Sequence, residues 1–292
     1  AKKGAIYYTT PLPDIQRWRY VRMAKLPLGK TVDYPDEYAP DVLFPIAREE
    51  ARSALGLNDR LPFHGVDAWN AWELTWLDAS GRPTVATATM MIDASSPNIV
   101  ESKSLKLYLG SFAMSRYENA ADVEHVIAAD IANVVGAAVD VTLHIGPNPA
   151  MAALASLPGR CIDDLPVEGL TEDVDSSLLR CTANSPADGE LHSHLLRSLC
   201  PVTGQPDYGS LLVRFEGAAI DPSSLLAYIV SFRRHNDFHE ACVERMFVDI
   251  LAECRPQKLT VSARYTRRGG IDINPFRTNF RDTADNGRLW RQ

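Results

Sequence analysis

The same order of strand-like and helix-like segments occurs twice along the 292-residue chain. In the first occurrence, aromatic and polar residues alternate from residue 68 to 77, residues 80–83 read Ser-Gly-Arg-Pro, and residues 84–92 form a second strand-like run. Two such runs around a glycine–proline turn predict a hairpin. Residues 139–145 predict a further strand. A helix is expected between the hairpin and this strand, because apolar side chains recur at helical spacing at Val123, Val126, Ile127, Ile131 and Val134.

The second occurrence follows a polar stretch, residues 158–190, that we expect to be irregular. Residues 208–215 are strand-like, and Asp221-Pro222 supplies an N-cap and a first-turn proline for the next helix. Residues 258–265 alternate between apolar and polar side chains, which predicts a half-buried strand. A second helix should start near Phe238, with an apolar stripe at Val243, Met246, Phe247, Ile250, Leu251 and Cys254.

Two consecutive units of antiparallel strands that flank a helix or helix pair predict the α+β class, not a doubly wound parallel sheet. We expect an N-terminal extension over residues 1–60, an N-terminal domain over 61–157 and a C-terminal domain over 158–292. The extension is rich in proline and charge and shows little periodicity beyond a short helical pattern near residues 45–55. It is expected to wrap on the core.

Charge and cysteine usage limit the partners and the compartment. The formal net charge of −7 provides no general field for a phosphate backbone, so an extended nucleic-acid interface is not expected. The five cysteines include no C-x-x-C pair, and this odd set indicates reduced thiols and a cytoplasmic location. There is no apolar h-region after the N-terminal charges and no run of about 18 apolar residues, so neither export nor membrane anchoring is expected.

Common cofactor and metal motifs do not occur in the sequence. G-x-G-x-x-G, a Walker loop, H-E-x-x-H and cysteine–histidine clusters with zinc spacing are all missing. His192 and His194 lie two positions apart, but without a third ligand nearby in the sequence they indicate a polar loop. We therefore predict no metal site.

The run Cys200-Pro201-Val202-Thr203-Gly204-Gln205-Pro206-Asp207 joins a thiol and a carboxyl through a stiff turn. A thiolate at a pocket wall, within reach of a group that exchanges protons, can act as a nucleophile. Most free cysteines are instead small buried apolar groups, and spacing alone favours that interpretation. The proline- and glycine-shaped loop favours a functional surface, because loops often carry function.

Three further segments combine charges with helix starts or glycines. In Phe238-His239-Glu240, the carboxylate either complements the helix dipole or accepts paired N–H donors from a purine-like ring, with His239 beside it. The segment Glu101-Ser102-Lys103-Ser104-Leu105-Lys106-Leu107-Tyr108 is either a solvated polar edge near a strand end or a binding segment. Arg267-Arg268-Gly269-Gly270 suits either a plain turn or phosphates that approach bare backbone.

Together these segments resemble the QueF family, the NADPH-dependent 7-cyano-7-deazaguanine reductases, in its long two-domain subgroup. The resemblance is carried, in this order, by residues 63–70, 101–112, 200–207, 238–240 and 267–275. It implies two tandem tunnelling-fold domains, each an antiparallel sheet packed with helices, and a homodimer. The implied reaction reduces the nitrile of 7-cyano-7-deazaguanine to 7-aminomethyl-7-deazaguanine in queuosine biosynthesis, a tRNA-modification pathway.

The resemblance also implies roles for individual residues. Cys200 would form a covalent thioimidate with the nitrile carbon, and Asp207 would protonate the nitrogen. Such a donor needs a raised pKa, which we expect burial of Asp207 to provide. A separate hypothesis concerns Cys242, which lies two residues beyond Glu240 and is therefore expected near Cys200, where the two could form a protective disulfide under oxidation. The substrate would contact Val100, Glu101, Ser102, His239 and Glu240, and NADPH would contact Ser102, Lys103, Arg268 and Gly269.

Two other interpretations stay open on the residues alone. Another tunnelling-fold enzyme on a pterin or purine-like ring, such as a cyclohydrolase-like protein, would need a zinc site. A non-catalytic purine-binding protein would keep the fold without the reaction. The histidines and cysteines offer no convincing set of zinc ligands for a cyclohydrolase, and the combination of Cys200, Asp207 and the intact segment 101–108 favours the reductase over a non-catalytic protein.

Overall fold

The computed structural model describes residues 34–57, 60–146, 153–167, 171–280 and 282–292, and for residues 182–186 the backbone alone. One long sheet forms its centre. Its strands are β2 (His64–Leu77), β3 (Pro83–Asp93), β5 (Val139–Ile145), β7 (Arg160–Cys161), β8 (Cys181–Leu199), β9 (Pro206–Ile220), β10 (Lys258–Tyr265) and β11 (Ile271–Thr278). They lie in the order β5-β3-β2-β11-β10-β9-β8-β7, and all neighbours are antiparallel except β7 and β8.

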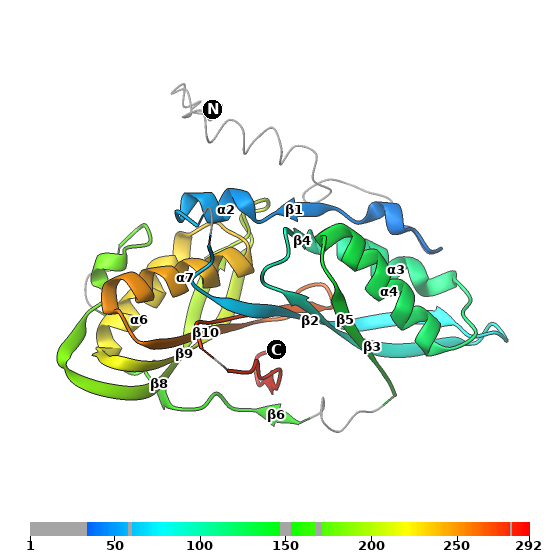
Figure 1. The fold of residues 1–292 in the computed structure, drawn as a ribbon. Coiled ribbons are helices and arrows are strands. Elements are labelled where there is room, and N and C mark those ends of the chain that lie inside the picture. Colours follow the sequence, from blue (N-terminus) through cyan, green and yellow to red (C-terminus); the bar gives the residue numbers. More distant parts are fainter. Residues whose placement is uncertain (1–33, 58–59, 147–152, 168–170, 281) are drawn as a thin grey trace, which may run out of the picture.

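The helices cover one face of this sheet, and the C-terminal segment lies on the other face (Figure 1). The longer helices are α2 (Glu49–Ala54), α3 (Ser102–Gly110), α4 (Ala120–Val135), α6 (Pro222–Ser231) and α7 (His239–Cys254). Short 3-10 turns cover Pro40–Val42, Ser111–Met114, Ser176–Leu178 and Phe232–Arg234. Two small pairs complete the structure, β1 (Pro45–Ala47) with β4 (Asn98–Val100), and β6 (Leu154–Ala155) with β12 (Arg288–Leu289). In the part of the chain that the structure describes, no helix has the length and apolarity needed to cross a membrane.

The α+β class and the two units of antiparallel strands with a helix pair are confirmed. The predicted hairpin is β2–β3, and residues 139–145 form β5. The predicted helix is α4, whose buried side chains include Val123, Ile127 and Ile131. Asp221 caps α6 by accepting a hydrogen bond from the backbone N–H of Ser224, and Pro222 is at the first turn, as predicted.

Several local predictions are wrong. Residues 181–190, expected to be irregular, belong to the 19-residue strand β8, whose breaks in register interrupt the alternation from which a strand is recognised. Residues 101–108 follow the end of β4, as predicted, but they form most of helix α3, which was not predicted. The helical pattern near residues 45–55 is confirmed for residues 49–54, which form α2, but residues 45–47 form strand β1. Strand β10 is buried on both faces, because polar side chains of its second face meet the C-terminal segment, as in the bond from Arg264 to Asn286.

The two units join edge to edge. Strand β2 of the first unit pairs with β11 of the second along eight residue pairs, from Ala71 with Ile271 to His64 with Thr278. The strands of both units therefore form a single sheet, with one apolar core beneath α6 and α7 and another beneath α3 and α4. The junction between β2 and β11 therefore lies in the middle of the sheet.

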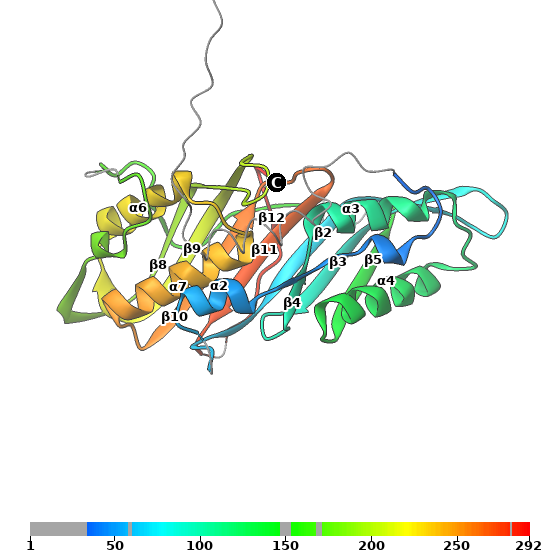
Figure 2. The ribbon, with the colours of Figure 1, turned by 90° about the horizontal axis from the view of Figure 1, so that it is seen from above.

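The described part of the N-terminal extension crosses this junction on the helix face (Figure 2). Strand β1 pairs with β4 of the first unit, and α2 lies against α7 of the second. Arg52 of α2 donates to Glu244 of α7 over 2.8 Å and 2.9 Å. Arg277 of β11 binds both Glu244 and Asp67, at 2.9 Å and 2.8 Å, and Arg48 binds Asp67 at 2.6 Å. This buried ionic network of five side chains ties the extension to both units.

Candidate active site

A pocket opens at the junction of the two units, on the helix side of the sheet. The first unit contributes Trp69 of β2, Ile99 and Val100 of β4, and Ser102 at the start of α3. The second unit contributes the remaining wall: Cys200, Pro201, Asp207, Asp237, Phe238, His239, Glu240, Arg268 and Ile273. Residues far apart in the sequence therefore meet because β2 and β11 are neighbours.

The Cys200 thiol is held at the wall by a closed turn. The backbone N–H of Cys200 donates to the carbonyl of Gln205, and its carbonyl accepts from the N–H of Gly204, both at 2.9 Å. Gly204 has φ +67°, a left-handed conformation that favours glycine. The loop predicted from the prolines and Gly204 thus connects β8 to β9 and fixes a buried thiol beside the pocket.

Asp207 is the second residue of β9, directly after this turn, and is ionised. Burial raises the pKa of its carboxyl, but the hydrogen bond and charge of His239, together with the charges of Arg268 and Lys106, lower the pKa below its usual value. Arg268 donates to its Oδ1 at 2.7 Å, and Nε2 of His239 lies 3.7 Å from the same oxygen. The prediction of a raised pKa for Asp207 is wrong, because burial brings the carboxyl next to His239, Arg268 and Lys106, which lower its pKa.

Glu240 is the acid whose pKa is raised. Burial, and then the charge of Asp67, raise the pKa of Glu240 to about 7, against smaller opposing effects of His239 and Arg48. Its Oε1 has no hydrogen-bond partner among the described residues. An unpaired buried carboxylate oxygen is costly, so its position in a pocket wall suits a ligand that brings N–H donors.

Three residues predicted to bind substrate or cofactor do not line this pocket: Glu101, Lys103 and Gly269. The Glu101 side chain is completely buried and accepts hydrogen bonds from the backbone N–H groups of Lys103 and Ser104, both at 2.8 Å. It therefore caps α3 and positions Ser102, which does line the pocket. The other predicted residues, Val100, His239, Glu240, Cys200, Asp207 and Arg268, all lie in the wall.

Lys106 was not assigned a role from the sequence, although it stands in the segment 101–108. Burial and the charge of Arg268 lower the pKa of its ammonium, while Glu101, Asp207 and Cys200 raise it. Its side chain also lies next to Gly269. Helical spacing from Ser102 could have indicated that Lys106 shares the pocket side of α3, had the segment been recognised as a helix.

Cys242 is fully buried on α7, and burial raises the pKa of its thiol well above the usual value. It is therefore a protonated, unreactive thiol in the resting protein. Any disulfide with Cys200 would have to be initiated at Cys200, since the thiolate is the reactive form.

A pocket between two α+β units, with a cysteine, an ionised aspartate and an unpaired glutamate in its wall, defines a cysteine-centred site for a small polar ligand. Two sequence families match the chain. The family described as "Nitrile reductase, 7-cyano-7-deazaguanine-reductase N-term" matches residues 34–143, and "QueF-like protein" matches residues 206–284.

Curated relatives match nearly the whole chain. A protein of Azoarcus sp. (strain BH72) is 53% identical over 257 residues, covering 88% of this chain and 91% of its own length. A protein of Saccharophagus degradans is 49% identical over 271 residues, covering 92% of this chain and 100% of its own length. Both are named NADPH-dependent 7-cyano-7-deazaguanine reductase. The chain belongs to this family, the QueF nitrile reductases, as the sequence motifs predicted.

Proposed function

We propose that this protein reduces the nitrile of 7-cyano-7-deazaguanine to the primary amine of 7-aminomethyl-7-deazaguanine with NADPH, as a step of queuosine biosynthesis. The observation that carries the proposal is the meeting of Cys200, Asp207 and Glu240 in one pocket wall of a chain with this family membership. Each group has a part in the chemistry that its surroundings support.

Cys200 adds to the nitrile carbon, which is a poor hydride acceptor until it is activated. In the free protein Asp207 is a carboxylate, so it first accepts the proton of the Cys200 thiol. It then passes this proton to the nitrile nitrogen as the carbon–sulfur bond forms, and the product is a neutral thioimidate. The low pKa of Asp207 thus suits a carboxylate that acts as base before it acts as acid.

Glu240 binds the ring of the substrate. A deazaguanine offers neighbouring N–H donors, and an ionised carboxylate accepts a pair of them. Oε1 of Glu240 is available for one such bond. His239, Val100 and Ser102 complete the contact surface in this proposal, and Glu101 acts through its cap on α3, which orients Ser102.

The residues near the pocket fit NADPH. Arg268 lies in the wall, and the glycine pair 269–270 has φ values of +58° and +75°, a bare backbone suited to a phosphate. Lys106 lies beside Gly269, Ser102 lines the pocket, and Lys103 follows it at the start of α3. When bound, NADPH supplies hydride, and two equivalents convert a nitrile to an amine. Closure of the site would protect the imine formed between the two reductions from water.

The assembly and location complete the proposal. We propose a cytoplasmic homodimer that acts on the free base and binds no nucleic acid, which accords with the net charge of −7. Light scattering of the purified chain tests the dimer. A monomer at micromolar concentration would contradict it.

Intact-mass spectrometry after addition of 7-cyano-7-deazaguanine without NADPH tests the function. We expect a mass gain of one substrate per chain, absent in Cys200→Ala and slowed in Asp207→Asn. Cys254→Ala is the matched control, because this thiol is also buried but does not line the pocket. No adduct at any pH, or an adduct that persists in Cys200→Ala, would contradict the proposal.

A further inference from the structure

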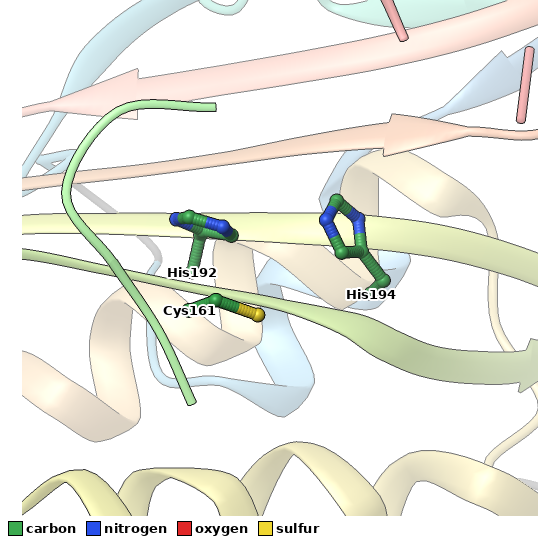
Figure 3. A group of neighbouring side chains, drawn as sticks. All are labelled: Cys161, His192 and His194. Carbon is green, nitrogen blue, oxygen red and sulfur yellow. The ribbon is translucent and has the colours of Figure 1, made fainter. Parts of the chain in front are cut away.

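A second cluster of chemically reactive side chains lies away from this pocket. Cys161, His192 and His194 bring one sulfur and two ring nitrogens within 4.8 Å of one another. Figure 3 shows the sulfur of Cys161 directed toward the space between the two rings. The sequence shows the two histidines but hides the third member, which lies 31 positions before His192 and reaches it because β7 pairs with β8, Cys161 beside His192.

The cluster is on the helix-free face of the sheet. Leu191 and Ile162 belong to the apolar core beneath the helices, so the neighbouring His192 and Cys161 point the opposite way. The C-terminal segment confirms this placement, because Trp290 packs edge-on against His194 with ring centroids 6.1 Å apart. Neither histidine lines the pocket of Cys200. The cluster is thus separate from the reductase chemistry.

In both histidines a hydrogen bond at Nδ1 orients the ring. Nδ1 of His192 lies 2.8 Å from the carbonyl oxygen of Pro158, and because a carbonyl only accepts, this nitrogen carries the proton. The lone pair of the neutral ring is then on Nε2. Nδ1 of His194 lies 2.7 Å from the Ser210 hydroxyl, which can accept in the same way. Metal-binding histidines are held by such bonds.

We propose that Cys161, His192 and His194 bind one Zn²⁺ ion, with water at the fourth position. A thiolate and two imidazoles are ligands that zinc prefers, and three protein ligands leave a tetrahedral ion one open position. Zinc–nitrogen bonds of about 2.0 Å and a zinc–sulfur bond of about 2.3 Å place the ligand atoms roughly 3.3–3.7 Å apart. Cys161 is exposed and can turn inward to close the remaining distance. Binding replaces the thiol proton, which is released to solvent.

The ion would stabilise the edge of the sheet formed by β7. Strand β7 is only two residues long and is the last strand beside β8. The Asp163 carboxylate already accepts from the backbone N–H of His194, at 3.1 Å, and from Ser193, at 2.6 Å. A zinc bridge from Cys161 to β8 would add a metal link to these hydrogen bonds. The ion would therefore hold this edge of the sheet, and its water-bearing fourth position lies away from the pocket of Cys200.

Cobalt titration of the reduced, tag-free, chelator-treated protein tests the site. We expect one Co²⁺ per chain with a thiolate-to-cobalt charge-transfer band, and displacement by Zn²⁺. Cys161→Ser should lose the band, and His194→Ala should bind at least about tenfold more weakly. Cys181→Ser and the exposed His125→Ala, which lie outside the cluster, are matched controls and should bind as the wild type does.

A second readout uses trypsin, because Arg160 is exposed directly before Cys161. Zinc should slow cleavage after Arg160 severalfold in the wild type and leave Cys161→Ser unaffected, while the nitrile reductase activity of both proteins stays equal. The proposal fails if the cobalt band is missing in the wild type, if it survives in Cys161→Ser, or if it disappears in Cys200→Ala instead. It also fails if zinc protects Arg160 equally in both proteins. None of these results depends on whether the substrate adduct forms at Cys200.

Discussion

Two glutamates one helical turn apart on α7 should respond to the same substitution in opposite ways. Glu240 and Glu244 are both buried, with 3% and 2% of their surface exposed. Glu240 has an oxygen without a partner and a pKa of about 7, whereas Glu244 binds the guanidinium groups of Arg52 and Arg277. We predict that Glu240→Gln removes a pH-dependent loss of stability and that Glu244→Gln destabilises the fold.

The size of the Glu240 effect follows from its pKa. A carboxyl with a folded pKa of about 7 and an unfolded value of 4.5 binds its proton more tightly in the folded state. Its contribution to stability is complete below pH 4.5 and is lost as the pH rises through 7. At 1.36 kcal/mol per pH unit, the loss between pH 5 and pH 8 is about 2–3 kcal/mol. Glutamine does not ionise, so the variant should not show this loss.

The contribution of Glu244 to stability depends on pH in the opposite direction. Burial raises its pKa, but Arg277, Arg52 and Arg48 outweigh burial and lower it, so its contribution is present above pH 4.5 and lost as the pH falls. Glutamine at this position leaves the buried guanidinium of Arg52 without its carboxylate partner and leaves Arg277 with Asp67 alone. Breaking a buried pair in this way costs about 3–5 kcal/mol.

Denaturant unfolding of both variants and the wild type at pH 5, 6, 7 and 8, at one protein concentration and without substrate, measures these effects. The informative quantity is the difference in unfolding free energy between Glu240→Gln and the wild type, which should grow by about 2–3 kcal/mol from pH 5 to pH 8. A difference that does not change with pH would refute the argument. The same variant should lose affinity for 7-cyano-7-deazaguanine, since the amide NH2 group is a donor and replaces one of the two oxygens that accept from the paired N–H groups.

Three further predictions concern the pocket and the junction. Arg268→Ala should raise the pKa of Asp207, measured by NMR titration of that carboxyl, because a cation 2.7 Å away is removed; an unchanged pKa would assign the shift to other groups. Mild peroxide should join Cys200 to Cys242, seen by non-reducing peptide mapping, and Cys200 found free or paired elsewhere would exclude the disulfide. Gly65→Ala should destabilise the protein in thermal unfolding, because a Cβ at φ +157° would collide with the backbone of β11; an unchanged melting temperature would contradict this.

Local elements could be predicted because their signals are local. Helix α6 begins where Asp221 and Pro222 place it, and β5 ends where its apolar run ends. The helix at residues 101–108 was missed for a physical reason. Glu101 is buried and its carboxylate caps the helix that follows it, but in the sequence it cannot be told from an exposed charge. The site residues were found by resemblance to a family, since Cys200 taken alone is an ordinary buried thiol.

Pairing between distant strands could not be predicted, and it determines the electrostatics. The raised pKa of Asp207 was expected from burial, but Arg268 lies 61 positions away and reaches Asp207 only because β9, β10 and β11 are neighbours. The Cys161 ligand was missed for the same reason, because two residues of parallel pairing give no recognisable periodicity. The sequence shows which charged groups the chain contains. Whether the pKa of one of them rises or falls depends on which other charged groups the fold places beside it.

Helix α7 shows how the junction connects stability to binding. Its first turn presents Glu240 to the pocket, and its second turn presents Glu244 to the ionic network beneath. Asp67 connects the two turns, since it binds Arg277 in the network and its charge also raises the pKa of Glu240. The network therefore holds the two units together and at the same time keeps Glu240 poorly satisfied. A substrate that donates N–H groups to Glu240 relieves this cost, so the same arrangement that weakens the free protein at neutral pH favours the bound one.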